Sequence, residues 1–434
     1  MKRYLFYSAA LILIGVGAGV GGIVLSLLLH ETQHLVFDYS LDSVLHGESF
    51  LHGLMSISPE HRFWGVLMAG LVATAGGVYL YNKRNTLVSV PTAVKNPLKR
   101  MTIGTSLFQV ILQIVTVAMG SPLGRETAPR QLGVLFASVC VQKMAGKKDA
   151  SSIPLFSRKE MSILIACGAG AGLAAVYNVP LAGALFTLEV LLRQLSLRTV
   201  LSALVTSFIA AWVGTLALGT GGQYTFHKSP LPNMFMLSLL AFLTSPLIGS
   251  AAYFFRSACN RAKHSAANGH PLAIICMMGF VLVAIISVWF PEIPGNGKGM
   301  LQTGLDDQLP FTLACALLFF KSLSVIVVLR GGVEGGVMTP GLAIGGCIGA
   351  IIFMVAGWVL PLEGFPAYIM AAAAGFLSVS MAMPVTTIVL VMELAHLPLP
   401  LVFPITACVA GACLSARGLA QYGSKMATHR ILDH

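Results

Sequence analysis

The sequence predicts an all-α protein that crosses a membrane many times. Of its 434 residues, 56% are apolar and only 10% are charged, whereas soluble domains usually carry about 25% charged residues. The mean hydropathy is +0.83. So little charge cannot cover a large soluble enzyme, and so much apolar surface excludes a disordered chain. The length allows on the order of 10–15 helices of about 20 residues, and we expect residues 1–434 to form one transmembrane domain.

The net charge of +11 comes mainly from short loops between apolar runs. This placement is the positive-inside pattern, and we expect no nucleic-acid partner because no basic patch with interleaved aromatic residues is present. Glu31 to Glu60 holds five acidic residues and no Lys or Arg, whereas Lys83 to Arg100 holds five basic residues and no acidic one. We therefore expect a cytoplasmic N-terminus, with the first loop outside and the second inside.

The first apolar run, Tyr4 to Leu29, spans 26 residues without a charge. It is longer than the core of a cleaved signal and indicates a retained membrane helix. Of roughly fourteen apolar segments, several are too short to cross about 30 Å of hydrocarbon. Met161 to Ala175 and Leu181 to Leu192 are two of these, broken at Asn178-Val179-Pro180. Short helices interrupted by Gly or Pro are typical of an ion site near the membrane midplane.

The two halves of the chain resemble each other, with approximate limits 1–220 and 221–434. Gly172 to Glu189 reads GLAAVYNVPLAGALFTLE, and Gly375 to Glu393 reads GFLSVSMAMPVTTIVLVME. In each, a proline stands nine residues before the glutamate. A weaker pair, GRETAP from Gly124 and GVMTP from Gly336, precedes these stretches in the same order. This order indicates an internally duplicated transporter.

The most costly charges in the sequence are Arg125 and Glu126, which follow the uncharged stretch Met101 to Met119. A charge at bilayer depth costs about 2.5–3.5 kcal/mol. One interpretation is a buried structural Arg–Glu pair. In the other, glycines unwind the chain and a helix begins near Glu126, so that its free N–H groups and positive dipole end face an anion. A carboxylate there would compete with the anion, and could gate the path and carry a proton.

A stretch with Gly and Pro that interrupts a helix is called a breaker, and GRETAP from Gly124 is the first. The second breaker, Gly335-Gly336-Val337-Met338-Thr339-Pro340, has no acid between its glycines and Pro340. We expect it to contribute backbone N–H groups of Val337 and Met338 to an anion. A close-packed glycine contact between helices is the alternative. Glu189 and Glu393 each end an apolar run, and for both a structural anchor and a role in the ion path stay open.

Taken together, these motifs resemble the CLC family of chloride channels and chloride/proton antiporters. The family patterns GREGP, NxPLxGxLFxxE and GGxFxP correspond, in order, to GRETA from Gly124, NVPLAGALFTLE from Asn178 and GGVMTP from Gly335. The resemblance covers nearly the whole chain. It implies an inverted repeat of many tilted and partial membrane helices, a homodimer in membrane lipid, and one chloride pathway per subunit. It maps the gating glutamate onto Glu126 and the anion-binding amides onto Val337 and Met338, with Arg125 beside them.

Two further anion ligands of the family have only approximate matches. The family serine motif is hard to find, and its best candidate is Ser89 in Val88-Ser89-Val90-Pro91. The pore tyrosine corresponds to Tyr422 only if about three residues are missing after Pro404. The resemblance is to prokaryotic members without cytoplasmic CBS domains, so we expect a prokaryotic inner-membrane protein that needs no cofactor, with chloride as its ligand.

One departure concerns the mechanism. Antiporters of the family usually carry a second, proton-transferring glutamate directly after the position of Glu189, and Val190 stands there. An apolar side chain cannot relay a proton, which favours a passive chloride channel gated by Glu126. A chloride/proton antiporter stays the alternative. Fluoride also stays open, because fluoride-exporting members depart from the patterns at similar places.

Two other classes of function compete with anion transport. His30-Glu31-Thr32-Gln33-His34 matches HExxH, which on a helix can bind zinc in a metalloprotease. The pattern is short and has no evident third ligand, so we expect an ordinary helix end, no metal site and no enzyme. A solute transporter of another duplicated fold is the other alternative. It would leave halide flux unchanged after Glu126→Ala.

Overall fold

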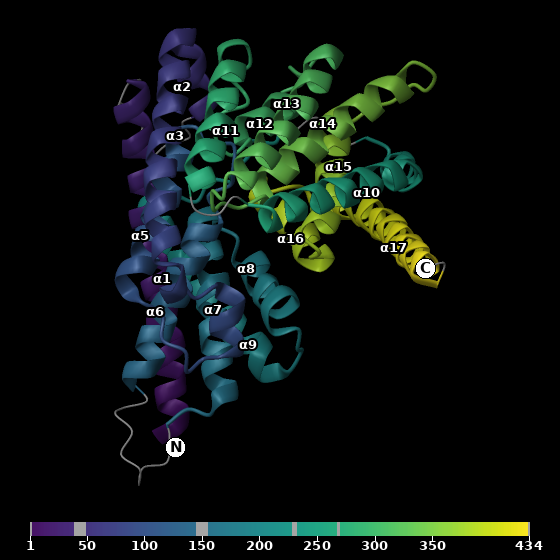
Figure 1. Ribbon diagram of the computed structural model, residues 1–434. Helices are drawn as coiled ribbons and strands as arrows, with labels where there is room; N and C mark the ends of the chain where they lie inside the picture. Colours follow the sequence, from purple (N-terminus) through teal and green to yellow (C-terminus); the bar gives the residue numbers. More distant parts are fainter. Residues whose placement is uncertain (1, 39–48, 145–154, 228–231, 267–269, 433–434) are drawn as a thin grey trace.

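The computed structural model describes residues 2–38, 49–144, 155–227, 232–266 and 270–432, and these residues form helices joined by loops (Figure 1). The all-α prediction is confirmed. The first half contains α1 (Lys2–Phe37), α2 (Phe50–Ser56), α3 (Pro59–Asn82), η1 (Arg84–Thr86), α4 (Val90–Lys95), α5 (Ile103–Ala118), α6 (Thr127–Met144), α7 (Arg158–Tyr177), α8 (Pro180–Phe186), η2 (Thr187–Leu192) and α9 (Leu197–Leu218). The second half contains α10 (Met234–His264), α11 (His270–Trp289), α12 (Lys298–Leu305), α13 (Phe311–Arg330), α14 (Met338–Gly357), α15 (Phe365–Ser380), α16 (Pro384–Leu394), η3 (Leu399–Leu401) and α17 (Val402–Leu432).

Within those ranges, nine helices are long and apolar enough to cross a membrane, and four apolar helices are shorter. The predicted mixture of full and partial helices is therefore confirmed. The N-terminus lies at one end of the molecule and α2 at the other (Figure 1). Residues 39–48 of the acidic first loop lie outside the described residues.

The run from Met161 to Ala175 is not a short helix, and this expectation was wrong. α7 has 20 residues because the polar segment before the run forms its first turn. Ser157 Oγ accepts a hydrogen bond from the N–H of Glu160, and the Glu160 carboxylate accepts one from the N–H of Ser157. This reciprocal capping box starts the helix three residues earlier than the apolar pattern does.

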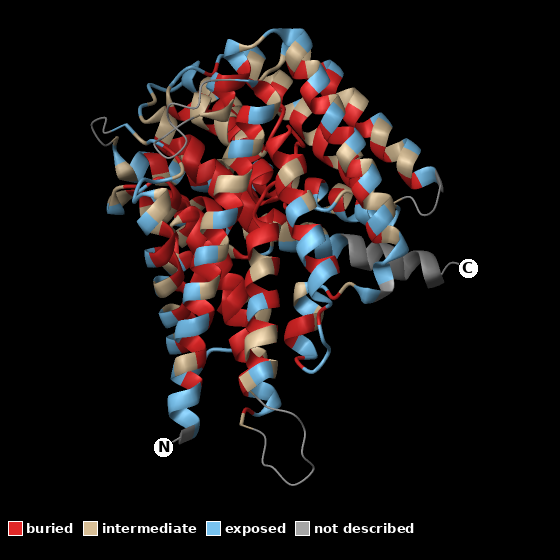
Figure 2. Ribbon diagram, turned by 90° about the vertical axis from the view of Figure 1, so that its left-hand side faces the viewer, coloured by how far each residue is buried: buried red, intermediate tan, exposed pale blue. Residues whose placement is uncertain are grey.

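α7 packs against α1, α6, α8 and α9 of the first half, and nearly all of its side chains are buried. Buried residues fill the interior of the helical bundle in Figure 2. The small residues of α7 allow close backbone approach. A Cβ atom on Gly168 would lie 2.8 Å from the Cβ of Ala137, and one on Gly172 would overlap the carbonyl of Pro129 in α6. Small residues at helix contacts are the usual means of association in membranes, where burial of apolar surface gives little driving force.

The two halves repeat the same backbone turn before their proline-led helices. Asn178 and Ala382 each lie two residues before the proline and adopt the left-handed conformation, with φ of 53° and 54°. The next residues, Val179 and Met383, have φ of −127° and −138° and nearly equal ψ. Asn tolerates this conformation better than Ala does. Because the same conformation recurs at Ala382, the turn belongs to the repeat and does not depend on Asn.

Glu189 and Glu393 each cap the helix of the opposite half. The Glu393 carboxylate accepts hydrogen bonds from the N–H groups of Leu181 and Ala182, at 3.0 and 2.8 Å. The Glu189 carboxylate accepts from the N–H groups of Val385 and Thr386, at 3.1 and 2.7 Å. Carboxylates satisfy the free N–H groups of a helix start and stabilise its dipole. The sequence left open whether these glutamates are structural anchors or part of the ion path, and the contacts in the structure are those of structural anchors.

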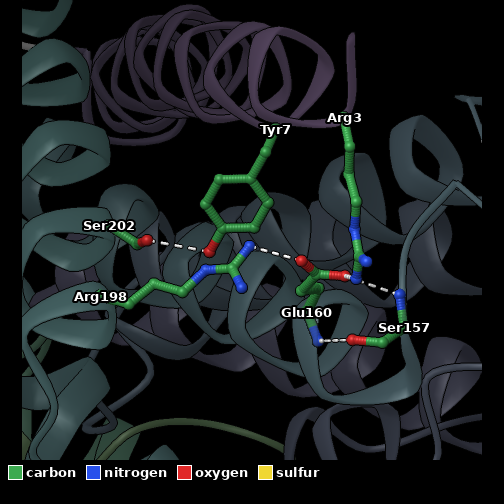
Figure 3. Close-up of polar contacts among 6 residues, drawn as sticks. All are labelled: Arg3, Tyr7, Ser157, Glu160, Arg198 and Ser202. Atoms are coloured by element: carbon green, nitrogen blue, oxygen red, sulfur yellow. Dashed lines mark hydrogen bonds and ion pairs between the residues drawn. The ribbon is translucent and has the colours of Figure 1, made fainter. Parts of the chain in front are cut away.

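A polar cluster fixes α1 to α7 and α9 near the N-terminal end (Figure 3). The buried Glu160 carboxylate pairs with Arg3 and, at 2.5 Å, with Arg198. The Arg198 guanidinium also lies over the ring of Tyr7, whose hydroxyl is 2.9 Å from Ser202 Oγ. Glu160 therefore completes the start of α7 and holds the neighbouring helices with the same carboxylate.

Candidate functional site: a closed anion pathway

The two glycine breakers meet each other. Gly124 and Gly336 exchange both backbone hydrogen bonds, with N···O distances of 2.7 and 2.9 Å. This two-residue antiparallel bridge holds the start of α6 next to the start of α14. The two motifs stand more than 200 residues apart in the chain, and this contact places both free helix ends at one point.

Glu126 lies at that point and is completely buried. Its carboxylate accepts a hydrogen bond of 2.7 Å from the N–H of Met338, and Thr339 Oγ1 lies 3.5 Å from its other oxygen. Met338 is the first residue of α14. The carboxylate therefore occupies the N–H group and the positive dipole end that would otherwise attract an anion. Val337, the residue before the helix, is also buried.

Arg125 does not pair with Glu126 in the described part of the chain. Its Nη2 donates to Gln223 Oε1 at 3.1 Å, and its guanidinium lies 5.2 Å from the centre of the Tyr177 ring. The structural Arg–Glu pair, one of the two interpretations of this motif, is therefore absent from the structure. The two charges are adjacent in sequence but point into different surroundings.

The glycines beside Glu126 are required because a side chain at either position would overlap the carboxylate. A Cβ atom at Gly336 would overlap the Glu126 carboxylate and its Cγ, and one at Gly124 would also overlap the carboxylate. Only a backbone without side chains can surround the carboxylate this closely. The alternative for the second breaker, a glycine contact between helices, does not describe this contact, because the partner is a charged side chain.

Three hydroxyl groups that the sequence analysis did not single out surround the same point. The Tyr177 hydroxyl lies 3.5 Å from Thr339 Oγ1, and the hydroxyl of Tyr224 is buried without a partner. These residues line a cavity of about 10 Å³ with Met338. Tyr177 directly precedes the NVP motif, which could have indicated it, whereas no pattern distinguishes Tyr224.

A larger cavity of about 510 Å³ lies beyond the start of α6, lined in part by Thr127, Arg130, Val190 and Glu334. Arg130 donates from Nε to the carbonyl of Glu126 at 2.8 Å and so brings a positive charge next to the gate. Ser89 also lines this cavity, where its hydroxyl is 2.8 Å from Thr92 Oγ1. Ser89 thus lies in the cavity but has no contact with Glu126, which lines neither cavity.

Tyr422 is not brought to this site, which corrects its assignment as an anion ligand. α17 continues as one helix from Val402 to Leu432, and Tyr422 lies on its outer part with 64% of its surface exposed. The C-terminus projects away from the centre of the molecule (Figure 1). Tyr177 and Tyr224 provide the tyrosine hydroxyls near Glu126 instead.

The HExxH pattern is not part of a metal centre in the structure. His30, Glu31 and His34 lie on α1, and no three His, Cys, Asp or Glu residues among those described could hold a metal ion. His30 Nδ1 is 2.7 Å from the carbonyl of Ser26. The metalloprotease alternative is therefore not supported.

Comparison with known proteins identifies the family of this chain. The family model for voltage-gated chloride channels matches residues 65–417, well over half of the chain. The chain belongs to this family. It is therefore an anion-transport protein of CLC type and not an enzyme.

Individual CLC proteins are similar over most of the chain. The voltage-gated ClC-type chloride channel ClcB of Citrobacter koseri is 29% identical over 326 residues, which cover 72% of this chain and 73% of the relative. A slow cyanobacterial Cl⁻/H⁺ antiporter has the same fold, with a TM-score of 0.76, 18% identity and 95% of both chains covered. A CLC-type fluoride/proton antiporter also matches, with a TM-score of 0.64, 18% identity, and 92% of this chain and 95% of that one covered.

Proposed function

We propose that this protein is a passive chloride channel in which Glu126 is the gate. The observation that supports this most directly is the 2.7 Å hydrogen bond from the Met338 N–H to the Glu126 carboxylate. A carboxylate held at the start of α14 has the same charge as a halide ion. It accepts a hydrogen bond from the Met338 N–H, which would otherwise bind the halide. The path is closed while Glu126 occupies this position and opens when the side chain leaves it.

Protonation gives Glu126 a reason to leave. A neutral carboxyl group accepts a weaker hydrogen bond from the Met338 N–H and interacts less with the helix dipole. Chloride then replaces it on the N–H groups of Val337 and Met338 and beside the hydroxyl of Thr339. Arg125 and Arg130 stand on the two sides of the gate and compensate the negative charge of the passing ion.

Passive conduction is supported by Val190, which lines the large cavity in place of an acid. A methyl-bearing side chain can neither accept nor donate a proton, so it offers no step that would link one proton to each cycle of chloride movement.

Chloride/proton exchange is the second candidate, and Glu334 is the observation in its favour. This carboxylate lines the same cavity as Val190 and also a neighbouring one of about 210 Å³ with Gln109 and Gln113. The Gln113 side chain donates to the carbonyl of Gly124 at 3.4 Å. A polar route from Glu334 to the gate would restore a proton path in spite of Val190.

The reversal potential of the purified protein in lipid bilayers decides between the two. With a chloride gradient alone, we expect the potential predicted for chloride, and an added pH gradient should leave it unchanged. A shift with pH would contradict the channel and, if Glu334→Gln abolished it, would establish exchange. Repeating the measurement with fluoride tests the choice of anion.

Replacing the gate tests the role of Glu126. In liposomes, Glu126→Ala should make chloride flux nearly independent of pH between pH 4.5 and pH 7.5, whereas the wild-type flux should increase on acidification. Glu31→Ala, also an acid-to-alanine change, is the matched control and should keep the wild-type profile. Equal profiles for wild type and Glu126→Ala would remove Glu126 from the mechanism.

We further propose that two copies of the chain form a homodimer with one pathway each, embedded in the inner membrane of a prokaryote with a cytoplasmic N-terminus. Family membership supports the dimer, and the basic segment Lys83 to Arg100 supports the orientation. The α2 end of the molecule would then face outward.

A further inference from the structure

A polar chamber borders α2 and Arg125, in front of the closed pathway. α2 lies at the end of the molecule opposite the N-terminus (Figure 1). The chamber has a volume of about 60 Å³, several times the 10–15 Å³ that a single water molecule needs, and it is lined by residues of α1, α2 and the loop before α12. Its polar lining consists of His30, Gln33, Ser49, Arg125, Glu292, Asn296 and Lys298.

Two cations face this chamber without an acidic partner. Arg125 is 9% exposed, and its buried Nε has no hydrogen-bond partner. Lys298 Nζ likewise has neither a hydrogen bond nor an ion pair in the part of the chain that the structure describes. Glu292 lines the chamber but pairs with neither cation, and one of its oxygens is itself unpartnered. Burying unpaired cations together is costly unless an anion joins them.

The chamber is connected to the gate through shared residues. Lys298 and Asn296 line both this chamber and the small cavity that contains Met338 and Thr339. Gln223, which accepts a hydrogen bond from Arg125, lines the small cavity too. An anion held by Arg125 and Lys298 would therefore be one step away from the donors that Glu126 occupies.

The loop that presents Lys298 is fixed before any ligand arrives. Lys321, completely buried in α13, donates from Nζ to the carbonyls of Ile293 and Gly295 at 2.7 and 2.6 Å. The N–H of Gly295 in turn donates to the carbonyl of Gly120, just before the first breaker. One loop is thus held against both the chamber and the gate segment, so the site is preorganised.

We propose that this chamber is a second anion site, in which Arg125 and Lys298 hold a small monovalent anion in front of the closed gate. The inference rests on the proposed anion pathway and adds a waiting position to it. Partial burial together with the Arg125 charge lowers the pKa of Lys298 to about 8, as expected for a cation that lacks an anionic partner.

Bromide, which scatters anomalously, provides a direct test in crystals of the wild-type protein at neutral pH. Glu126 then occupies the gate, so an anion at the α2 end can only be in the chamber. We expect an anomalous peak within about 3.5 Å of Lys298 Nζ and of the Arg125 guanidinium group, consistent with hydrogen-bonding distances to a large halide. The peak should vanish in Lys298→Met crystals. No peak in wild-type crystals would overturn the proposal.

Flux measurements give a second, independent readout. Lys298→Met should raise the chloride concentration for half-maximal flux about fivefold, which corresponds to about 1 kcal/mol, and Lys298→Arg should restore it. Lys83→Met, which removes the same charge from a residue that lines neither cavity, should change nothing. If Lys298→Met and Lys83→Met gave the same half-saturation, the chamber would not serve the pathway. If wild type carried no chloride at all, the proposed function would fail, while the bromide peak would still test the site.

Discussion

At the scale of single residues, the gate depends on the absence of side chains at the two glycines around Glu126. The carboxylate is enclosed by the bare backbone of Gly124 and Gly336, and both glycines use their own N–H and C=O groups to pair with each other. The hydrogen-bond donor to the carboxylate is the N–H of Met338, two residues after Gly336. Because the enclosure is made of backbone, its shape is fixed, and a single added methyl group decides whether the side chain fits.

Gly336→Ala should therefore open the gate without touching Glu126 itself. The new Cβ would overlap the carboxylate, and the flexible glutamate side chain is the part that can move. We expect chloride flux at neutral pH to rise toward that of Glu126→Ala and to lose most of its pH dependence. Gly341→Ala is the control, because its Cβ would lie at an ordinary 3.4 Å from Ser380 Oγ. Wild-type flux in Gly336→Ala would mean that the observed position of Glu126 does not close the path.

At the scale of helices, the proline-led helices α8 and α16 are complete only together. Each is short, and each has its first N–H groups satisfied by a glutamate at the end of the other. The glutamates stand nine residues after the prolines in both helices, but the chain beyond them differs. In the first half, the stretch from Thr187 to Leu192 is a π-helix, so Glu189 and Val190 lie in a widened turn. Such turns are frequent at functional sites, and this one faces the large cavity.

Glu393→Gln should destabilise the protein by about 1–3 kcal/mol, because an amide replaces a carboxylate that accepts two N–H groups and one amide donor then faces them. Thermal unfolding in detergent measures this as a lower midpoint. Glu189→Gln should cost at least as much, since its carboxylate accepts a further bond from Thr386 Oγ1.

Glu363→Gln is the matched control for both variants, since Glu363 is exposed in the loop before α15. Its midpoint should stay within the small range typical of surface substitutions. An equal midpoint for Glu393→Gln and Glu363→Gln would show that the caps contribute nothing to stability.

At the scale of the whole molecule, the few charged residues fall into two groups. Most lie at the ends of helices, and a few, among them Glu126, Arg125 and Lys321, lie inside the molecule, where each has a specific role. The N-terminus and α2 are at opposite ends (Figure 1). The two sides of the pathway therefore differ: Arg125 and Lys298 are at one, and Arg130 is at the other.

We expect an N-terminal fusion to a green fluorescent protein to fluoresce in bacterial cells, because this reporter folds in the cytoplasm. Alkaline phosphatase fused directly after α1 should be active, since it requires the outer side. The physical reason is the contrast between the acidic first loop and the basic segment Lys83 to Arg100. An inactive phosphatase with a dark N-terminal fusion would reverse the orientation, and with it the outward direction of the chamber.

Much of the architecture could be predicted from the sequence because it depends on patterns along the chain. Apolar runs predict helices, and the equal spacing from Pro180 to Glu189 and from Pro384 to Glu393 predicts the repeat. Contacts between distant segments carry no such pattern. The partner of each glutamate lies in the other half, and Lys298 stands at the start of the short helix α12, where no sequence pattern marks it. Tyr422 was assigned by its position in the chain, which does not show where a continuous helix such as α17 carries it.

The crossed glutamate caps also have a consequence for biosynthesis. Ala182 receives its carboxylate from a residue 211 positions later, so at roughly 5–20 residues per second the start of α8 waits about 10–40 s for Glu393 to be made. Throughout this time its free N–H groups must be satisfied by water or by the insertion machinery, because lipid offers no acceptor. α16 has no such delay, since Glu189 already exists when it emerges. When the second half is synthesised, the glutamate that caps α16 is therefore already present. A chain that ends before Glu393 leaves the first N–H groups of α8 without their carboxylate.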